Sequence, residues 1–134
     1  MVNGVSRKIE ETLNGWTSDG MAEDGETLTI DFGKEVSLSE MRFVFHSDFN
    51  YPIRVTMAPN RQRQQRDGVP AELVKDYDLV FRKDGKTVHT ESVRGNHQRH
   101  NIVRFAPVAC DSVEVRLLST NGSKDVTVFE VRAY

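Results

Sequence analysis

The stretch that decides the fold is residues 91–134, ESVRGNHQRHNIVRFAPVACDSVEVRLLSTNGSKDVTVFEVRAY. It contains three short apolar runs, and each run is closed by polar or turn residues. The apolar side chains alternate with others in every run: Val103 and Phe105, then Val113, Val115 and Leu117, then Phe129 and Val131. A period of two places one face of a strand on a core and leaves the other face in water. We therefore predict three antiparallel strands in the last third of the chain.

Alternation predicts further strands upstream of this stretch. Residues 28–32 alternate up to Gly33, which is expected to end that strand, and residues 41–45 alternate in the next one. Residues 73–93 predict a hairpin with Asp84-Gly85 as its tight turn. The total is seven strands with no long helix. This pattern is typical of an all-β fold, an antiparallel β-sandwich of jelly-roll type with about seven to eight strands.

Two segments lack alternation. The first 26 residues carry four Asn-Gly or Asp-Gly pairs, which are turn signals, and Trp16 is expected to plug one end of the core. Residues 46–72 contain three prolines and the run NRQRQQRDG. Ordering residues 57–70 costs backbone entropy that their few apolar side chains do not offset. We expect this loop to be mobile, or to dock on a neighbouring domain.

Length and composition indicate one globular domain over residues 1–134. The chain has 37% hydrophobic and 28% charged residues, and its formal net charge is −2. No apolar run approaches the ~20 residues that a membrane-spanning helix requires. Cys110 is the single cysteine, so no internal disulfide forms, and we expect it to be a small, half-buried, unreactive filler.

The order of several motifs resembles that of the discoidin-like domains, also called coagulation factor 5/8 C-terminal or galactose-binding-like domains. The motifs are NG, W.SD, LTIDFG, MRFVF, RF.PV, TNG and FEVRAY. The set GNHQRH…RF.PV…TNG…VFE.R.Y resembles a module at the C-terminal end of bacterial FAD-dependent oxidoreductases. The resemblance implies a module excised from a longer protein, binding carbohydrate or a neighbouring domain. FAD would then lie in the rest of a parent protein that is periplasmic or secreted.

The resemblance also implies a structural calcium site in many relatives. The matching positions here are Asn3, Asn14 and Glu130. Calcium prefers several oxygen ligands with negative charge. Amides at two of these three positions are expected to weaken such a site.

Two groups of residues are candidates for ligand binding. Phe49 and Tyr51, beside Asp48 and Asn50, combine stacking faces with hydrogen-bonding groups, as sugar recognition requires, or they pack under the long loop. The second group is a polar, basic rim at the end of the sandwich where loops collect. It comprises Arg94, His97, Arg99 and His100. These side chains bind a ligand, or hydrogen-bond neighbouring loops; a zinc site would need further ligands from distant strands.

Other functions find less support in the sequence. No G-x-S-x-G, G-x-G-x-x-G or P-loop motif is present, so no catalytic residue is assigned. The arginines of the long loop suggest polyanion binding, but the pI of about 6.1 argues against nucleic acid. These are Arg54, Arg61, Arg63 and Arg66. The sequence thus predicts a non-catalytic binding or docking module. The alternatives are an independent enzyme that uses the His97/His100 loop and a polyanion-binding domain.

Overall fold

The computed structural model describes residues 5, 14–47, 55, 57–63, 65 and 68–134. Antiparallel strands dominate these residues, and the predicted β-sandwich is confirmed. The elements are β1 (Trp16–Ser18), β2 (Glu26–Phe45), α1 (Pro59–Gln62), β3 (Val74–Lys83), β4 (Lys86–Val93), β5 (His100–Thr120) and β6 (Val126–Ala133). No described helix has the length and apolar character needed to cross a membrane.

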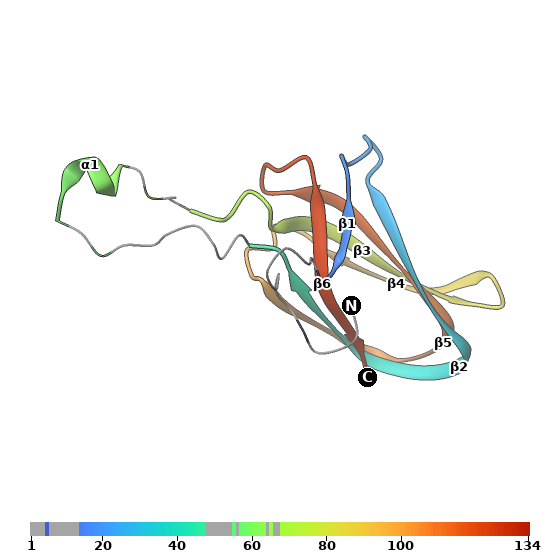
Figure 1. Ribbon diagram of the computed structural model, residues 1–134. Coiled ribbons are helices and arrows are strands. Elements are labelled where there is room, and N and C mark those ends of the chain that lie inside the picture. The colour runs from blue at the N-terminus through green and yellow to red at the C-terminus, as the bar shows by residue number, and fades with distance from the viewer. Residues whose placement is uncertain (1–4, 6–13, 48–54, 56, 64, 66–67) are drawn as a thin grey trace.

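Two long strands, β2 and β5, belong to both layers of the sandwich. Residues 26–31 of β2 pair with residues 112–117 of β5, which also pair with β3, and β3 pairs with β4. Residues 41–44 of β2 pair with residues 100–103 of β5, and residues 41–45 pair with β6, whose other neighbour is β1. The continuous strand order β1-β6-β2-β5-β3-β4 therefore folds over into two facing layers (Figure 1).

The bends in these strands have local causes. The register of β2 against β5 shifts between Asp31 and Val36, where Gly33 has φ 66° and donates its N–H to Asp31 Oδ1 at 2.7 Å. A second shift lies opposite Pro107, which has no N–H to donate. The prediction that Gly33 ends a strand is wrong: its left-handed backbone bends the strand without ending it. Residues 100–120 likewise form one strand where two were predicted. These two mergers remove two of the seven predicted strands and the unpredicted β1 adds one, so the described residues form six strands.

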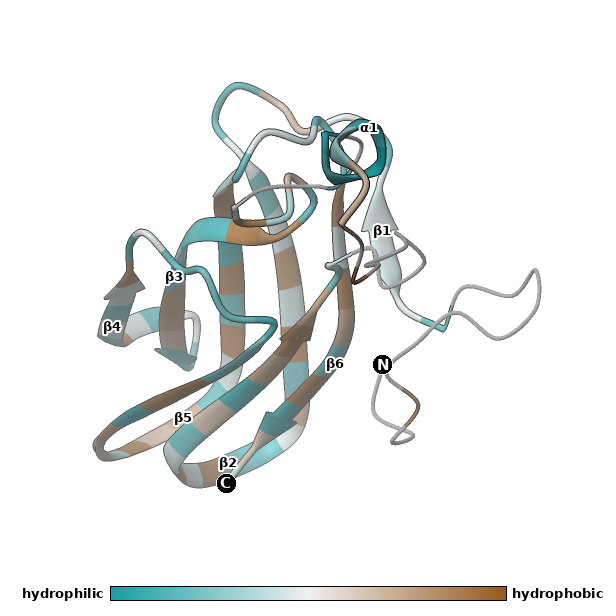
Figure 2. Ribbon diagram, turned by 90° about the vertical axis from the view of Figure 1, so that its left-hand side faces the viewer, coloured by the Kyte–Doolittle hydropathy of each residue, from teal (hydrophilic) through white to brown (hydrophobic). Residues whose placement is uncertain are grey.

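The predicted alternation identifies the core correctly. Nine inward side chains of the two layers are fully buried: Met41, Phe43, Phe45, Tyr77, Leu79, Phe81, Val113, Val115 and Leu117. The Tyr77 ring lies 5.4 Å from the rings of both Phe43 and Phe45, so it joins the two layers by edge-to-face contacts. Brown and teal bands alternate along the strands in Figure 2.

Three smaller predictions concern single positions. The Asp84-Gly85 turn is confirmed, since both residues have positive φ, 49° and 73°. Trp16 is partly buried and packs on the core as expected, although it belongs to a short strand and not to a loop. Cys110 is fully buried, and burial raises the pKa of its thiol.

Candidate functional site

One face of the β6–β2–β5 layer is turned away from the core, and we call it the outer face. Along β2, Met41, Phe43 and Phe45 point inward, so the residues between them point outward. The strand register and the backbone hydrogen bonds align outward residues of the three strands in rows. The rows are Tyr134–Glu40–Arg104, Arg132–Arg42–Ile102 and Glu130–Val44–His100.

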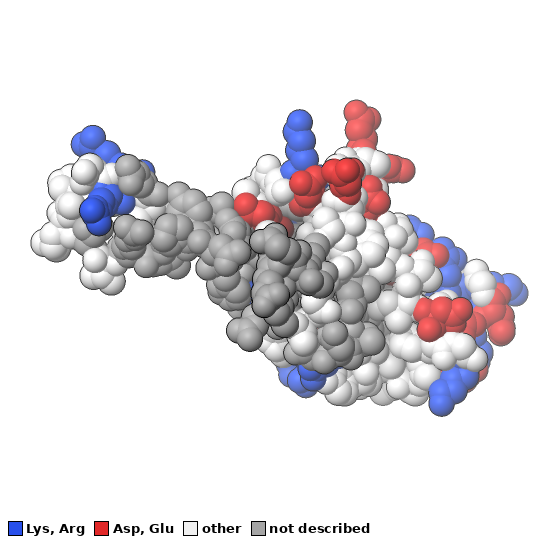
Figure 3. Space-filling view, in the orientation of Figure 1, with Lys and Arg blue, Asp and Glu red and all other residues white. Residues whose placement is uncertain are grey.

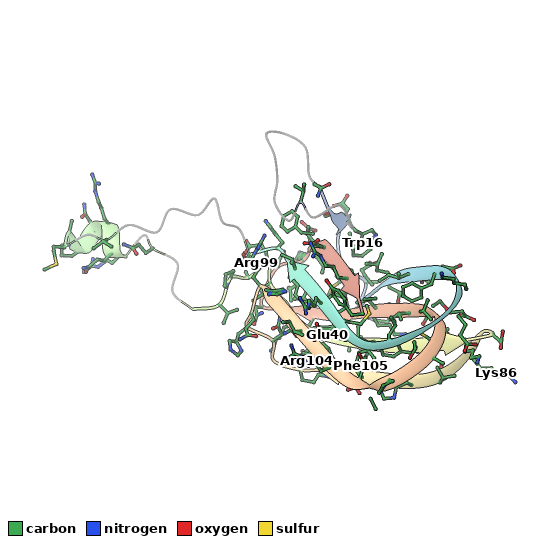
Figure 4. All side chains as sticks on the ribbon, turned by 90° about the horizontal axis from the view of Figure 1, so that it is seen from below. Trp16, Glu40, Lys86, Arg99, Arg104 and Phe105 are labelled. Atoms are coloured by element: carbon green, nitrogen blue, oxygen red, sulfur yellow. The ribbon has the colours of Figure 1, made fainter. Side chains whose placement is uncertain are left out.

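Ion pairs link the charged residues of the outer face. Glu40 accepts from Arg42 Nε and lies 2.7 Å from Arg104 Nε, and Figure 4 places Glu40 close to Arg104. The hydrogen bond from Arg42 is the main reason that the pKa of Glu40 is lowered. Arg132 donates its Nε and one Nη to the same oxygen of Glu130, at 2.8 and 2.7 Å. The Arg42 guanidinium also lies 4.7 Å from the centre of the Tyr134 ring.

A β-bulge in β6 decides what lies next to this network. Val44 pairs with Glu130 and Phe45 pairs with Val128, so Phe129 is an extra residue in the strand. The Phe129 ring lies 5.5 Å from the His46 ring and 5.8 Å from the Arg99 guanidinium carbon. Burial lowers the pKa of Arg99. The bulge thus gathers aromatic and cationic groups beside Glu130, at the end of the layer where the loops begin.

A hollow of about 230 Å³ lies in the outer face. It is lined by Arg42, Val44, His100, Glu130 and Arg132. At about 30 Å³ per water molecule, it has room for roughly eight waters, which is the scale of one sugar ring. Glu130 is only 7% exposed, whereas His100 is exposed. The hollow therefore presents charged donors, one carboxylate and one imidazole around the aliphatic Val44.

The loop of residues 94–99 is fixed to the body of the domain by Asn96, which is 5% exposed. Its Nδ2 donates to Val74 O at 2.7 Å and to Gln98 O at 3.1 Å. Its Oδ1 accepts from Gln98 N at 3.0 Å and from Asn101 Nδ2 at 2.6 Å. Asn101 in turn accepts from the Tyr77 hydroxyl at 3.1 Å. A buried amide with four partners holds this loop in one conformation.

The predicted basic rim is divided between different environments. Arg94 turns back onto the sheet, where it donates to Tyr77 O at 3.0 Å and pairs with Asp78 at 2.7 Å, so its role there is structural. His97 is exposed on the loop, while Arg99 packs on Phe129. His100 lies in the outer-face hollow. The four side chains thus lie in different surroundings, and their part in ligand binding stays a prediction.

Other predicted site residues lie outside the described part of the chain. These are Phe49, Tyr51 and Asn3, together with Arg54 and Arg66 of the long loop. For zinc, no group of three or more His, Cys, Asp or Glu suited to a metal occurs among the residues that the structure describes.

The two described calcium candidates form a poor donor set. The carboxylate of Glu130 is paired with the Arg132 guanidinium, which a cation would have to displace. Asn14 donates its Nδ2 to Val5 O, and its amide oxygen carries no negative charge. A cation therefore gains little charge compensation from these residues.

A second hollow, of about 450 Å³, lies at the opposite end of the sandwich, beside the bend of β2 and the β3–β4 turn. Its charged groups bond to one another. Lys83 Nζ lies 2.6 Å from Glu35, and Asp111 accepts from Asp84 N at 2.6 Å and from Ser112 Oγ at 2.8 Å. These contacts stabilise the bend, and no aromatic side chain lines the hollow. It is the weaker candidate for a ligand.

Sequence reasoning missed Arg42, Val44 and Arg132 as site residues. They lie on the polar side of strands whose apolar side was used to find the core, and 90 residues separate the two arginines. The available signal was a charged pattern in strands, E-M-R-F-V at 40–44 and E-V-R at 130–132. Asn96 was also missed, because nothing in the sequence marks one asparagine in a loop as buried.

No family model and no curated protein matches the chain. Solved structures do match it. A family 32 carbohydrate-binding module from Streptococcus pneumoniae EndoD is 18% identical, with a TM-score of 0.69 over 100% of this chain and 82% of that one. A chitosan-binding module from a Paenibacillus sp. IK-5 chitosanase/glucanase is 11% identical, with a TM-score of 0.66 over 98% and 80%.

A third similar structure is a Clostridium perfringens module in complex with GalNAc-β-1,3-galactose. It is 12% identical, with a TM-score of 0.60 over 94% of this chain and 79% of that one. At these identities the likeness establishes the fold. The predicted architecture is confirmed: the chain has the discoidin-like, galactose-binding-like β-sandwich fold.

Proposed function

We propose that this domain is a non-catalytic carbohydrate-binding module. The observation that carries the proposal is the outer-face hollow, which has the size of one sugar ring and is lined by donors and acceptors around Val44. Sugar hydroxyls donate and accept at once, and one face of a sugar ring is apolar, so sites of this composition suit them. The similarity to carbohydrate-binding modules supports the proposal.

The site that we propose extends from the hollow to the loop end. His97 and Arg99 lie on the loop that Asn96 fixes, so the backbone that carries them is already ordered before a ligand binds. Phe49 and Tyr51 complete the proposal as stacking residues for further sugar units. Each further sugar would then add contacts, and affinity is expected to rise with chain length.

Binding to a panel of immobilised glycans tests this function, followed by calorimetry with the best ligand. The panel includes galactose, N-acetylgalactosamine, fucose and chitosan oligosaccharides with their acidic counterparts. We expect binding that His100→Ala weakens and that Lys86→Ala, at the opposite end of the sandwich (Figure 4), leaves unchanged. Absence of binding to every glycan would contradict the proposal.

We propose further that the domain belongs to a larger FAD-dependent oxidoreductase of bacterial origin and docks on or serves that parent. The support is the resemblance of the GNHQRH…RF.PV…TNG…VFE.R.Y set. The reading frame upstream in the gene tests this directly. A strand followed by G-x-G-x-x-G, the dinucleotide-binding motif, is the expected finding, and an unrelated domain there would contradict it.

Calcium binding remains a proposal, of weak affinity, because Arg132 holds the carboxylate of Glu130. We expect the thermal midpoint to shift by less than about 1 °C between excess Ca²⁺ and a chelator, since weak binding stabilises little. A large shift that Glu130→Gln removes would show a strong site.

Polyanion binding is the second candidate function, and one observation favours it. Arg61 and Arg63 are exposed on and beside α1, and Figure 3 shows basic side chains gathered there, away from the sandwich. Salt-sensitive retention on heparin that Arg61→Ala and Arg63→Ala abolish would support it. Retention that persists in this double variant would exclude α1 as the site.

A further inference from the structure

We propose that the outer-face hollow selects a negatively charged sugar unit, one that carries a carboxylate or a sulfate. The inference rests on the proposed function and specifies its ligand.

The charge of the lining is the first argument. Two arginines, Arg42 and Arg132, face one glutamate, Glu130, across a hollow of about 230 Å³. The next acid on the face, Glu40, lies outside this lining and is shared by Arg42 and Arg104. The hollow is therefore net positive even when His100 is neutral, and its recessed wall excludes part of the solvent that would screen an anion.

Arg42 and Arg132 also have N–H groups that their protein partners do not use. A guanidinium has five N–H groups in a planar fork. Among the described residues, Arg42 uses its Nε for Glu40, and Arg132 uses its Nε and one Nη for Glu130 and one further N–H for the Tyr134 side chain. Both side chains therefore keep N–H groups that can bind an anion. Two N–H groups on one planar anion form the strong, bidentate type of hydrogen bond.

The carboxylate of Glu130 does not oppose this selection. It is 7% exposed, and both bonds from Arg132 go to one of its oxygens, Oε1. Its charge is thus compensated inside the protein, and the other oxygen can accept from a sugar hydroxyl. Val44 lies between Glu130 and His100 in the strand register and offers an aliphatic floor for the carbon face of the ring. Charged recognition and sugar recognition therefore occur in the same hollow.

Galacturonic acid, galactose 6-sulfate and galactose form the matched probes, since they differ only at carbon 6. Binding to the 134-residue chain is followed by amide chemical shifts and by calorimetry. We expect one of the two anionic sugars to bind about tenfold more tightly than galactose, as one additional charged hydrogen bond of about 1.4 kcal/mol implies. Which anion is preferred distinguishes uronic acids from sulfated sugars. The preference is expected to fall as salt rises.

Arg42→Met tests the assignment, because it removes the fork while Glu40 keeps its pair with Arg104. We expect this variant to lose the tenfold preference and to keep galactose binding. Arg42→Lys should restore part of the preference, and Arg116→Met, on the other layer, should not change it. If Arg42→Met folds poorly, Arg42→Lys tests the assignment alone, because it keeps a positive charge but loses the planar fork, so the preference should fall and galactose binding should remain.

Two outcomes would overturn the inference. Equal affinity of the unmodified chain for galactose and both anionic sugars would contradict selection of charge and leave the proposed function intact. The same holds if Arg42→Met keeps the full preference. Absence of binding to all three sugars and to the glycan panel would contradict the proposed function itself.

Discussion

Two polar connections leave the same end of the sandwich, and they differ in how they are held. The loop of residues 94–99 is fixed by Asn96, which bonds to backbone of β3 and to its own loop. The segment of residues 57–63 contains α1, which has no buried residue and no side-chain N-cap hydrogen bond. Met57 there is 93% exposed. Composition does not separate the two, since both are rich in Asn, Gln and Arg. The difference lies in whether a side-chain amide reaches buried backbone groups.

The largest expected effect comes from removing the amide that holds the loop. Asn96→Ala breaks four hydrogen bonds and leaves Val74 O without one of its donors, so we expect unfolding to become easier by about 2–4 kcal/mol. Asn60→Ala, in α1, should change stability by less than about 0.5 kcal/mol. Urea unfolding measures both. Equal effects would mean that Asn96 is not what distinguishes the loop.

A smaller effect is expected from Tyr77, which donates to Asn101, a hydrogen-bond partner of Asn96. Tyr77→Phe removes the hydroxyl that donates to Asn101, at a cost of about 1 kcal/mol. Burial raises the pKa of Tyr77. A raised pKa means that the unfolded chain ionises first, so its contribution to stability is present below about pH 10 and lost above it.

The contribution of Tyr77 to alkaline unfolding is tested by comparing the stability of Tyr77→Phe and of the unmodified chain as pH rises. The variant should lose less stability than the unmodified chain between neutral pH and pH values above about 10. Tyr134→Phe, at a residue that is 49% exposed, serves as the control and should behave as the unmodified chain does. An unchanged alkaline profile in Tyr77→Phe would contradict the expectation.

Lowering the pH should destabilise the loop of residues 94–99, by less than the substitutions described above. Asp76 accepts from the Ser119 hydroxyl at 2.6 Å and from Gly95 N at 2.8 Å, and these bonds lower its pKa, the Ser119 bond most. A lowered pKa contributes stability above the unfolded value of about 3.9, which is lost as pH falls through the folded value. Asp76→Asn should therefore flatten the decline of stability below pH 4.

Urea midpoints at neutral and acid pH measure the effect of Asp76→Asn. The control is Asp125→Asn, an exposed acid in the loop between β5 and β6 whose Oδ1 accepts from Gly20 N. If both variants decline with pH as the unmodified chain does, Asp76 does not hold the loop through its charge.

The smallest effect on stability is expected from proteolytic cleavage within residues 57–63, the segment that contains α1. Trypsin should cleave first after Arg61 and Arg63, which are exposed, and leave the sandwich folded. Arg94 and Arg99 should resist, because the first is paired with Asp78 and the second packs on Phe129. Mass spectrometry of early fragments identifies the order. First cleavage at Arg94 or Arg99 would mean that the loop of residues 94–99 is held less firmly than the segment of residues 57–63.

The sequence predicted the parts of this fold that depend on local alternation. Every second residue of 41–45 and of 113–117 points inward as expected, because period-two patterns need no knowledge of partners. It did not predict that Gly33 bends a strand, since positive φ suits a turn and a bend equally. Nor did it reveal the bulge at Phe129, which exists only relative to β2.

The candidate site was predicted only in part. His100 and Glu130 were selected for different reasons, and the structure brings them to one hollow. Arg42 and Arg132 complete it from two strands that are adjacent in space and far apart in sequence. No local pattern states which strands are neighbours, so the hollow could not be assembled without the fold.

The two strands that pass through both layers have a consequence for folding. Pairings such as Glu26 with Leu117 join distant parts of the chain, so loop closure must precede most of the sheet and folding is expected to be slow. Because β2 and β5 run through both layers without interruption, we expect the two layers to open together. Amide exchange in the two layers should then report one common opening free energy, as for a single foldon. A ligand on the outer face would slow exchange throughout the sandwich, including at β4.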